Sequence, residues 1–75
     1  MKKVSILIVD DHKLIRETWS FILGSDPRFE VIADCGDPEK AIELAAAYKP
    51  NVVLMDINMT PMSGFDATER IRQAS

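Results

Sequence analysis

The sequence has few of the residues that several classes of protein require. Its single cysteine, Cys35, excludes an internal disulfide framework and a CxxC metal site, and we expect it to be a small buried hydrophobe on a strand. The three glycines, Gly24, Gly36 and Gly64, are too dispersed for a GxGxxG or P-loop phosphate cradle. A disulfide scaffold and a glycine-rich nucleotide site are therefore excluded.

Basic charge and long apolar runs are also scarce. The net charge of −3 provides no general basic field that would hold nucleic acid or an anionic membrane. Residues 1–3 and the apolar run that follows them only faintly imitate a signal peptide. The run has six residues, ends at two aspartates and lacks a small-residue cleavage site. We therefore expect a cytoplasmic protein whose chain itself binds neither nucleic acid nor membrane.

The residues that are present have the composition of one small globular domain. Hydrophobic residues make up 47% of the chain and charged residues 28%, which is typical of a packed soluble chain rather than a disordered one. A chain of this size buries only about 60% of its unfolded surface. We therefore expect a packed core but marginal stability.

Three short runs have the composition of strands. Residues Val4 to Val9 are mostly apolar and β-branched. Residues Phe29 to Cys35 mix apolar and polar positions, as strands at the edge of a sheet do. Residues Val52 to Met55 are continuously apolar, which is typical of a strand that is covered on both faces in the middle of a sheet.

Two stretches with helical spacing separate these strands. The first runs from Lys13 to about Leu23, and Gly24 follows it as a stop signal. The second begins at Asp37-Pro38, an N-cap followed by a proline at the first helical position, and ends before Pro50. The apolar residues that we expect to pack are Ile15, Trp19, Ile22 and Leu23 in the first helix, and Ala41, Leu44, Ala45 and Tyr48 in the second.

A third helix completes an alternation of strands and helices. Ser63, with Asp66 three residues later, resembles a capping box, and the helical pattern continues through Arg72. The order β-α-β-α-β-α implies parallel strands that are joined by right-handed crossovers. The sequence therefore predicts an α/β fold.

Acidic residues follow two of the three strands at equivalent positions. Asp10 and Asp11 come directly after the first strand, and Asp56 comes directly after the third. If these strands are neighbours, in the spatial order 2-1-3, the three carboxylates converge where parallel α/β sheets place their reactive crevice. Carboxylates held close together need a cation, and oxygen ligands without His or Cys favour Mg²⁺ over zinc or copper. The alternative is that each aspartate is merely a solvated loop residue.

Two longer motifs resemble a known family. The segments IVDDH, residues 8–12, and LMDINMTPMSGFDATERIR, residues 54–72, resemble the amino-terminal part of a response-regulator receiver domain. The paired aspartates, an aspartate about 45 residues later and a glycine eight residues beyond it form a fairly specific combination. The resemblance implies a two-component signalling module with an incomplete flavodoxin-like fold and the sheet order 2-1-3. Such domains are often joined to helix-turn-helix DNA-binding effectors.

The resemblance implies a role for each acidic residue. Asp10 and Asp11 match the acidic pair that holds Mg²⁺ in the family. Asp56 matches the phosphoacceptor, and Asn58 matches the residue whose backbone carbonyl also reaches the metal. The phosphoryl donor is then a sensor histidine kinase. The sequence departs from the family pattern at Thr60, where a proline usually stands, and this departure concerns the local turn rather than the chemistry.

The resemblance also implies parts that the 75 residues do not supply. Later strands of the family bring a Ser or Thr and a Lys to the same pocket, whereas no lysine follows Lys49 here. We therefore interpret residues 1–75 as a partial receiver domain, without the later strands and helices or any effector domain that could bind DNA. In a 2-1-3 sheet the third strand would be an outer strand without charge or proline. We expect self-association through that edge or through an exchanged element.

Other functions stay open at this point. The segment DINMT, residues 56–60, approximates the DxDxT signature of aspartate-nucleophile phosphatases, which would make the chain an enzyme. However, Asn58 stands where that class needs its second carboxylate, and the signature normally follows the first strand. A receiver-like half domain could also serve only for protein association. His12 could be a phosphorelay histidine, but we expect a partly exposed residue near the start of the first helix.

Overall fold

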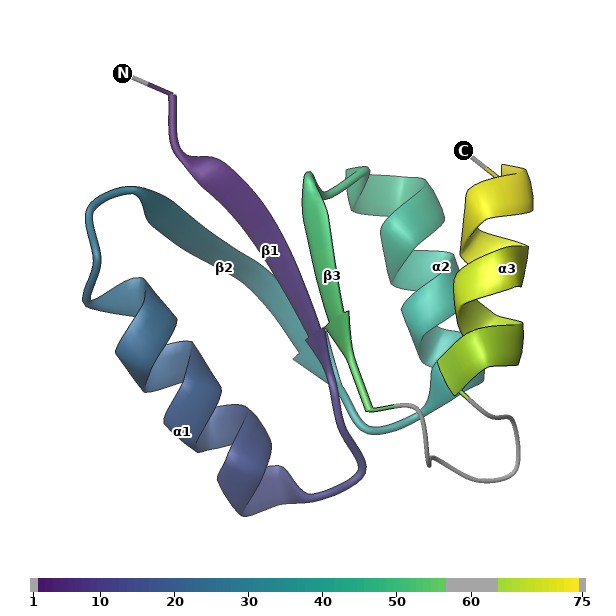
Figure 1. The fold of residues 1–75 in the computed structure, drawn as a ribbon, viewed down its shortest axis with the longest axis horizontal. Coiled ribbons are helices and arrows are strands. Elements are labelled where there is room, and N and C mark those ends of the chain that lie inside the picture. Colours follow the sequence, from purple (N-terminus) through teal and green to yellow (C-terminus); the bar gives the residue numbers. More distant parts are fainter. Residues whose placement is uncertain (1, 57–63, 75) are drawn as a thin grey trace.

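The computed structural model describes residues 2–56 and 64–74, in which strands and helices alternate (Figure 1). The elements are β1 (Val4–Val9), α1 (Lys13–Gly24), β2 (Phe29–Cys35), α2 (Pro38–Tyr48), β3 (Val52–Met55) and α3 (Gly64–Ala74). The predicted bounds of all three strands are confirmed, whereas the capping box predicted at Ser63 lies outside the described residues. No helix in this part of the chain is long and apolar enough to cross a membrane.

The three strands form one parallel sheet in the order β2-β1-β3. β1 pairs along its length with β2, and its residues from Ile6 to Val9 pair with β3. The predicted α/β class and the order 2-1-3 are therefore confirmed. The composition of β3 predicted a strand in the middle of the sheet, and this is wrong for the described residues, because β1 is the only strand among them that pairs with β3.

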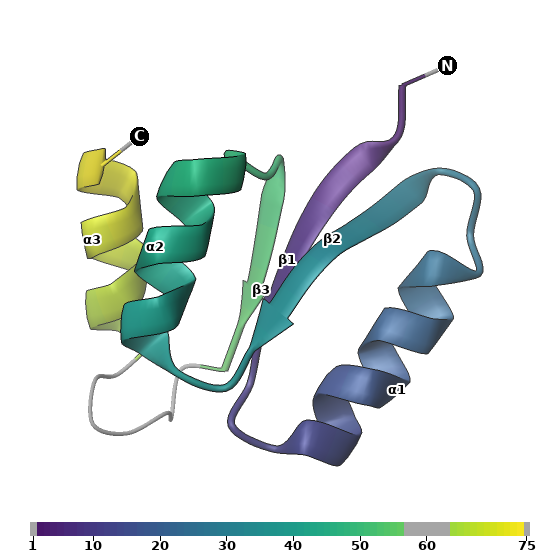
Figure 2. The same cartoon turned by 180° about the vertical axis from the view of Figure 1, so that it is seen from behind.

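β1 is the most buried element of the sheet. Its residues Ile6, Leu7, Ile8 and Val9 are each at most 3% exposed. Figures 1 and 2 show α1 on one side of the sheet and α2 with α3 on the other. Leu7 and Val9 join a core cluster with Ala41 and Ala45 of α2. Successive residues of a strand point to opposite faces of its sheet, so β1 has side chains on both faces. The core thus has helices on both sides of the sheet.

The helix α2 has the start that the sequence predicted. The carboxylate of Asp37 accepts a hydrogen bond from the backbone nitrogen of Glu39 at 3.1 Å, and Pro38 is buried in the first turn. Ala41 and Ala45 face the core as predicted, but Tyr48 is 59% exposed. The prediction that Tyr48 packs in the core is therefore wrong; Tyr48 is the last residue of α2.

Cys35 is buried at the end of β2, which confirms its predicted place on a strand. Burial raises the pKa of its thiol above the usual value. The Cys35 thiol is therefore protonated and weakly reactive at neutral pH, and it serves as a packed side chain.

The helix α1 leaves much of its apolar surface exposed. No residue of this helix, which is described along its whole length, is buried. The exposed apolar side chains are Leu14 (75%), Ile15 (42%), Trp19 (47%), Phe21 (76%) and Ile22 (51%). The prediction that Ile15, Trp19 and Ile22 pack in the core is therefore wrong in this structure. The reason is that α1 packs mainly on β2, and an open groove separates it from β3.

Candidate functional site

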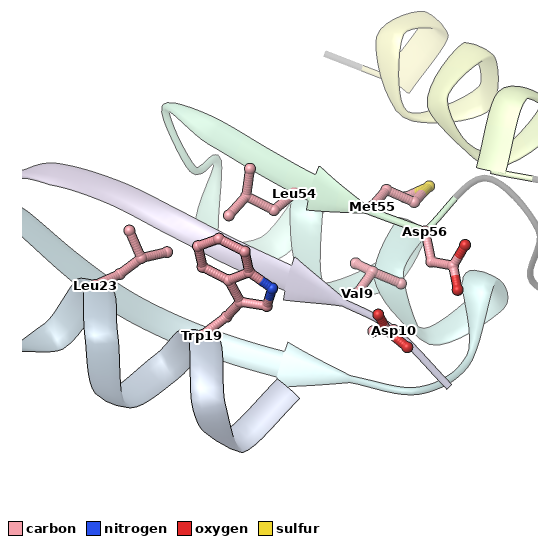
Figure 3. Close-up of a pocket in the computed structure, with 7 residues that line it drawn as sticks. All are labelled: Val9, Asp10, Trp19, Leu23, Leu54, Met55 and Asp56. Atoms are coloured by element: carbon pink, nitrogen blue, oxygen red, sulfur yellow. The ribbon is translucent and has the colours of Figure 1, made fainter. Parts of the chain in front are cut away.

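Three carboxylates and one imidazole gather at the carboxyl edge of the sheet. Asp10, Asp11, His12 and Asp56 each offer one potential ligand atom, and these four atoms all lie within 4.8 Å of one another. Figure 3 shows Asp10 and Asp56 at the adjoining ends of β1 and β3. The structure thus brings together the three aspartates that the sequence singled out, while Asn58 lies outside the described residues.

Asp56 owes its position to hydrogen bonds at both ends of β3. At the start of the strand, the side-chain oxygen of Asn51 accepts a hydrogen bond from the backbone nitrogen of Ser5 at 2.9 Å. At its end, the backbone nitrogen of Asp56 donates to the carbonyl oxygen of Val9 at 3.0 Å. The short strand is therefore tied to the buried β1 beyond both of its ends, and the Asp56 carboxylate is carried on rigid backbone.

Asp10 directly follows β1, where the chain turns toward α1. Its backbone nitrogen donates to the carbonyl oxygen of Cys35 at 3.0 Å, which continues the sheet by one residue. Its carboxylate accepts a hydrogen bond from the backbone nitrogen of His12 at 2.8 Å, a side-chain turn typical of aspartate. Because the strand ends at Val9, Asp10 and Asp11 can both face the same edge. The Asp10 side chain is only 17% exposed, and that of Asp11 is 40% exposed.

His12 takes part in the cluster in a way that the sequence did not predict. Its side chain is 64% exposed at the start of α1, as expected, but its Nδ1 lies 3.0 Å from Oδ1 of Asp10 and 2.9 Å from Oδ1 of Asp11. The hydrogen bond to Asp10 and then the charge of Asp11 raise the pKa of His12 above its usual value. The adjacency of all three residues in DDH was the only sequence signal for this contact.

Arg16 also belongs to this edge of the sheet, although no sequence pattern singled it out. Its side chain is 18% exposed, and its Nη1 donates to the backbone carbonyl oxygen of Asp10 at 2.7 Å. Its Nε donates to Oδ1 of Asp34 at 3.1 Å. Arg16 is therefore the side chain of α1 that connects the acidic edge to the end of β2.

An open groove of about 650 Å³ adjoins the acidic cluster between α1 and β3 (Figure 3). It is lined by Val9, Asp10, Trp19, Leu23, Leu54, Met55 and Asp56. The groove is apolar along its length and acidic where Asp10 and Asp56 lie. Because Trp19 lines the same groove as these aspartates, its fluorescence is a suitable reporter of changes at the site.

The donor set fits a hard divalent cation. Carboxylate oxygens are the ligands that Mg²⁺ prefers, and the partial exposure of Asp11 leaves room for the water ligands that Mg²⁺ retains. The nitrogen of His12 that faces the cluster, Nδ1, is already held by Asp10 and Asp11. The residues present thus fit Mg²⁺ held by Asp10, Asp11 and Asp56 better than they fit zinc.

The chain combines a parallel α/β sheet in the order 2-1-3 with an acidic cluster at its carboxyl edge, and comparisons with known proteins identify the family to which it belongs. The family model for the response regulator receiver domain matches residues 6–75. This chain therefore belongs to the response regulator receiver domain family, whose members are signalling modules of two-component systems. The resemblance noted in the sequence and the flavodoxin-like fold are confirmed.

Several curated proteins resemble the chain over nearly its whole length. Transcriptional regulatory protein DegU of Brevibacillus brevis is 49% identical over 95% of this chain, which covers 30% of DegU. The nitrate/nitrite response regulator protein NarP of Escherichia coli is 43% identical over 91% of this chain, which covers 32% of NarP. A protein-glutamate methylesterase/protein-glutamine glutaminase of Methanococcus maripaludis is 44% identical over 95% of the chain, which covers 20% of that enzyme. The chain thus spans a third or less of these relatives.

Solved receiver structures share the fold closely. The response regulator domain of Thermotoga maritima CheB superposes with a TM-score of 0.94 at 31% identity, over 99% of this chain and 55% of that one. A LuxR-family two-component response regulator from Aurantimonas gives a TM-score of 0.90 at 32% identity, over 96% of this chain and 51% of that one. The chain therefore spans about half the length of these two solved chains.

Asp11 provides the first test of the metal site. In the full-length protein, Asp11→Asn is expected to raise the dissociation constant for Mg²⁺ at least about tenfold, because it removes one charged ligand. Calorimetric titration with Mg²⁺ measures this, with Trp19 fluorescence as a second signal. An unchanged affinity in Asp11→Asn contradicts the assignment.

Asp26→Asn is the matched control for that titration. The Arg28 guanidinium holds the pKa of Asp26 below its usual range, so Asp26 is ionised at neutral pH. The control therefore removes one negative charge, as Asp11→Asn does, but it does so before the amino end of β2, outside the acidic cluster. Asp26→Asn is expected to bind Mg²⁺ as the wild type does.

Proposed function

We propose that this chain is the phosphoacceptor module of a two-component response regulator, in which Asp56 takes a phosphoryl group from a phosphohistidine of a sensor histidine kinase. The observation that carries the proposal is the convergence of Asp10, Asp11 and Asp56 at the ends of β1 and β3, with ligand atoms within 4.8 Å of one another. Membership of the receiver domain family supports it.

Asp56 is the nucleophile in this proposal. One of its carboxylate oxygens attacks the phosphorus of the donor, the bond between phosphorus and the imidazole nitrogen breaks, and the imidazole leaves with the bonding electron pair. A carboxylate is a weak nucleophile, so the step depends on in-line placement and charge neutralisation rather than on strong activation. The hydrogen bond from the Asp56 nitrogen to Val9 supplies the placement, because it fixes the backbone that carries the carboxylate.

Charge neutralisation is the second requirement. Asp10 and Asp11 make the edge of the sheet negative, so they oppose an incoming phosphoryl group unless a cation is present. We propose that Asp10, Asp11 and Asp56 hold Mg²⁺, with the backbone carbonyl of Asn58 as a further ligand implied by the family resemblance. When bound, Mg²⁺ offsets the repulsion between the carboxylates and the phosphoryl oxygens.

The partners proposed for the full-length protein follow from the same assignment. The phosphoryl donor is a sensor histidine kinase, and the site works in the cytoplasm. We also propose an output in the control of transcription through a DNA-binding effector, and the similarity to Transcriptional regulatory protein DegU supports this proposal.

Phosphoryl labelling of the full-length protein tests the proposal. A small phosphodonor is expected to label the protein when Mg²⁺ is present and not when a chelator removes it. The label is expected to be stable in acid and labile in base, as an acyl phosphate is. A module that serves only for protein association takes up no label, and a phosphatase instead releases phosphate continuously. Absence of label at saturating donor and Mg²⁺ contradicts the proposed function.

A further inference from the structure

Arg16 joins the acidic edge of β1 to the end of β2. One donor of its guanidinium group, Nη1, bonds the carbonyl oxygen of Asp10 at 2.7 Å, and another, Nε, bonds a carboxylate oxygen of Asp34 at 3.1 Å. The side chain is 18% exposed, whereas the exposed fractions of the other ion-paired Arg and Lys side chains in the described residues are 49% or more. The Arg16 side chain is therefore better shielded from solvent than the other ion-paired cations, although its partner Asp34 is 47% exposed.

The chain leaves space for this guanidinium at Gly36. A Cβ atom on Gly36 would lie 2.6 Å from Nη1 of Arg16 and 3.4 Å from the carbonyl oxygen of Asp10. No described glycine has a positive φ, so backbone conformation does not require glycine at this position. The missing side chain instead allows the close approach of Arg16 to the backbone of Asp10.

The bond from Arg16 completes the fixation of the Asp10 backbone. The nitrogen of Asp10 is already held by the carbonyl oxygen of Cys35 at 3.0 Å. The carbonyl oxygen of Asp10 belongs to the peptide group that leads into Asp11, beyond the end of β1. Holding that oxygen fixes the plane of this peptide, and thereby the directions in which the carboxylates of Asp10 and Asp11 leave the chain.

We infer that Arg16 is a positioning residue for the metal site, holding the peptide between Asp10 and Asp11 so that both carboxylates face Asp56. The inference rests on the proposed function, because it concerns the Mg²⁺ that this function requires. The role assigned to Arg16 is to hold the backbone of Asp10 rather than to bind the metal or the phosphoryl group. Its guanidinium is paired with Asp34, and the contribution that we assign to Arg16 is geometric.

The two donors explain why the residue is an arginine. From one planar group, Nε reaches the carboxylate of Asp34 in β2, and Nη1 reaches the carbonyl oxygen of Asp10 just beyond the end of β1. A lysine ammonium on a flexible stem can keep the bond to the Asp10 carbonyl but cannot present the same planar fork. Arg16→Lys is therefore expected to retain part of the function that Arg16→Ala loses.

Titration of the full-length protein with Mg²⁺ alone tests the inference. Arg16→Ala is expected to raise the dissociation constant about tenfold, the lower range for loss of a residue that orients a metal ligand. Arg16→Lys is expected to lie between Arg16→Ala and the wild type. The direction of the change in the dissociation constant is diagnostic. Removal of a positive charge beside an acidic site would by itself strengthen cation binding and lower this constant, whereas loss of positioning raises it.

Two further variants separate positioning from charge and from folding. Arg28→Ala removes the same charge and a similar ion pair, that of Arg28 with Asp26 at 2.7 Å, next to the amino end of β2. It is expected to leave Mg²⁺ affinity at the wild-type value. Gly36→Ala keeps Arg16 but takes the space of its guanidinium, so it is expected to weaken binding as Arg16→Ala does. If circular dichroism shows that Arg16→Ala is unfolded, Arg16→Lys and Gly36→Ala decide the question.

The outcomes separate the inference from the function on which it rests. A wild type that binds Mg²⁺, with Arg16→Lys and Gly36→Ala binding equally well, overturns the positioning role and leaves the proposed function intact. A loss of Mg²⁺ affinity in Arg28→Ala that is as large as the loss in the Arg16 variants also overturns the positioning role. A wild type that binds no Mg²⁺ overturns the metal site of the proposed function, and the inference with it.

Discussion

Asp56→Asn in the full-length protein is expected to abolish phosphoryl labelling by a histidine kinase or a small phosphodonor. An amide oxygen does not replace a carboxylate as a nucleophile, and the substitution also removes a charged ligand from the cation. The change keeps the size and shape of the side chain, and the backbone bond from residue 56 to Val9 does not depend on it. The variant is therefore expected to fold, and its loss of label is expected to be chemical.

Asp26→Asn is the matched control for this variant. It replaces an aspartate that precedes the amino end of β2 by asparagine, and it is expected to label at the wild-type rate. The measurement is the time course of label incorporation in the presence of Mg²⁺. Labelling of Asp56→Asn at the rate of the control contradicts the assignment of the phosphoacceptor.

The polypeptide of residues 1–75 alone is expected to self-associate, aggregate or remain partly unfolded. Within the described sheet, β3 pairs with β1 on one side only, and Val52 and Leu54 are 39% and 38% exposed. An unpaired strand edge without charge or proline invites pairing with another chain. Leu14 and Phe21 of α1 add exposed apolar surface, with exposed fractions of 75% and 76%.

Light scattering across a dilution series measures this association. The apparent mass of residues 1–75 is expected to exceed 8.4 kDa and to fall on dilution. Leu54→Lys places a charge on the exposed edge strand and is expected to shift the population toward the monomer. A cooperatively folded monomer of 8.4 kDa at all concentrations contradicts the prediction.

The parts of the structure that the sequence predicted correctly depend on local signals. The strand Val4–Val9 has a β-branched composition, and the helix that begins at Pro38 has its cap at Asp37, so both could be read from neighbouring residues. The convergence of Asp10 and Asp56 needed only one further rule, that parallel strands present their carboxyl ends at one edge. These predictions hold because each rests on chemistry within a few residues or on a general rule of topology.

The parts that were missed depend on tertiary neighbours. Helical spacing identified the apolar face of α1, but it does not say whether another element covers that face, and Trp19 is 47% exposed. The composition of Val52–Met55 likewise says nothing about which strands pair with it. The role of Arg16 could not be predicted because its partners are far apart in the sequence: Asp10 follows β1 and Asp34 lies in β2, and they come together only in the folded sheet.

Direct identification of the residue that carries the phosphoryl group tests whether Asp56 is the phosphoacceptor, because loss of label in a variant can have an indirect cause. The wild-type full-length protein is labelled with the phosphodonor and Mg²⁺, and borohydride then converts a phosphorylated aspartate to homoserine, which mass spectrometry locates. The expected result is homoserine at position 56 and at no other aspartate. Modification at Asp10 or Asp11, or a phosphoryl group on His12, contradicts the account.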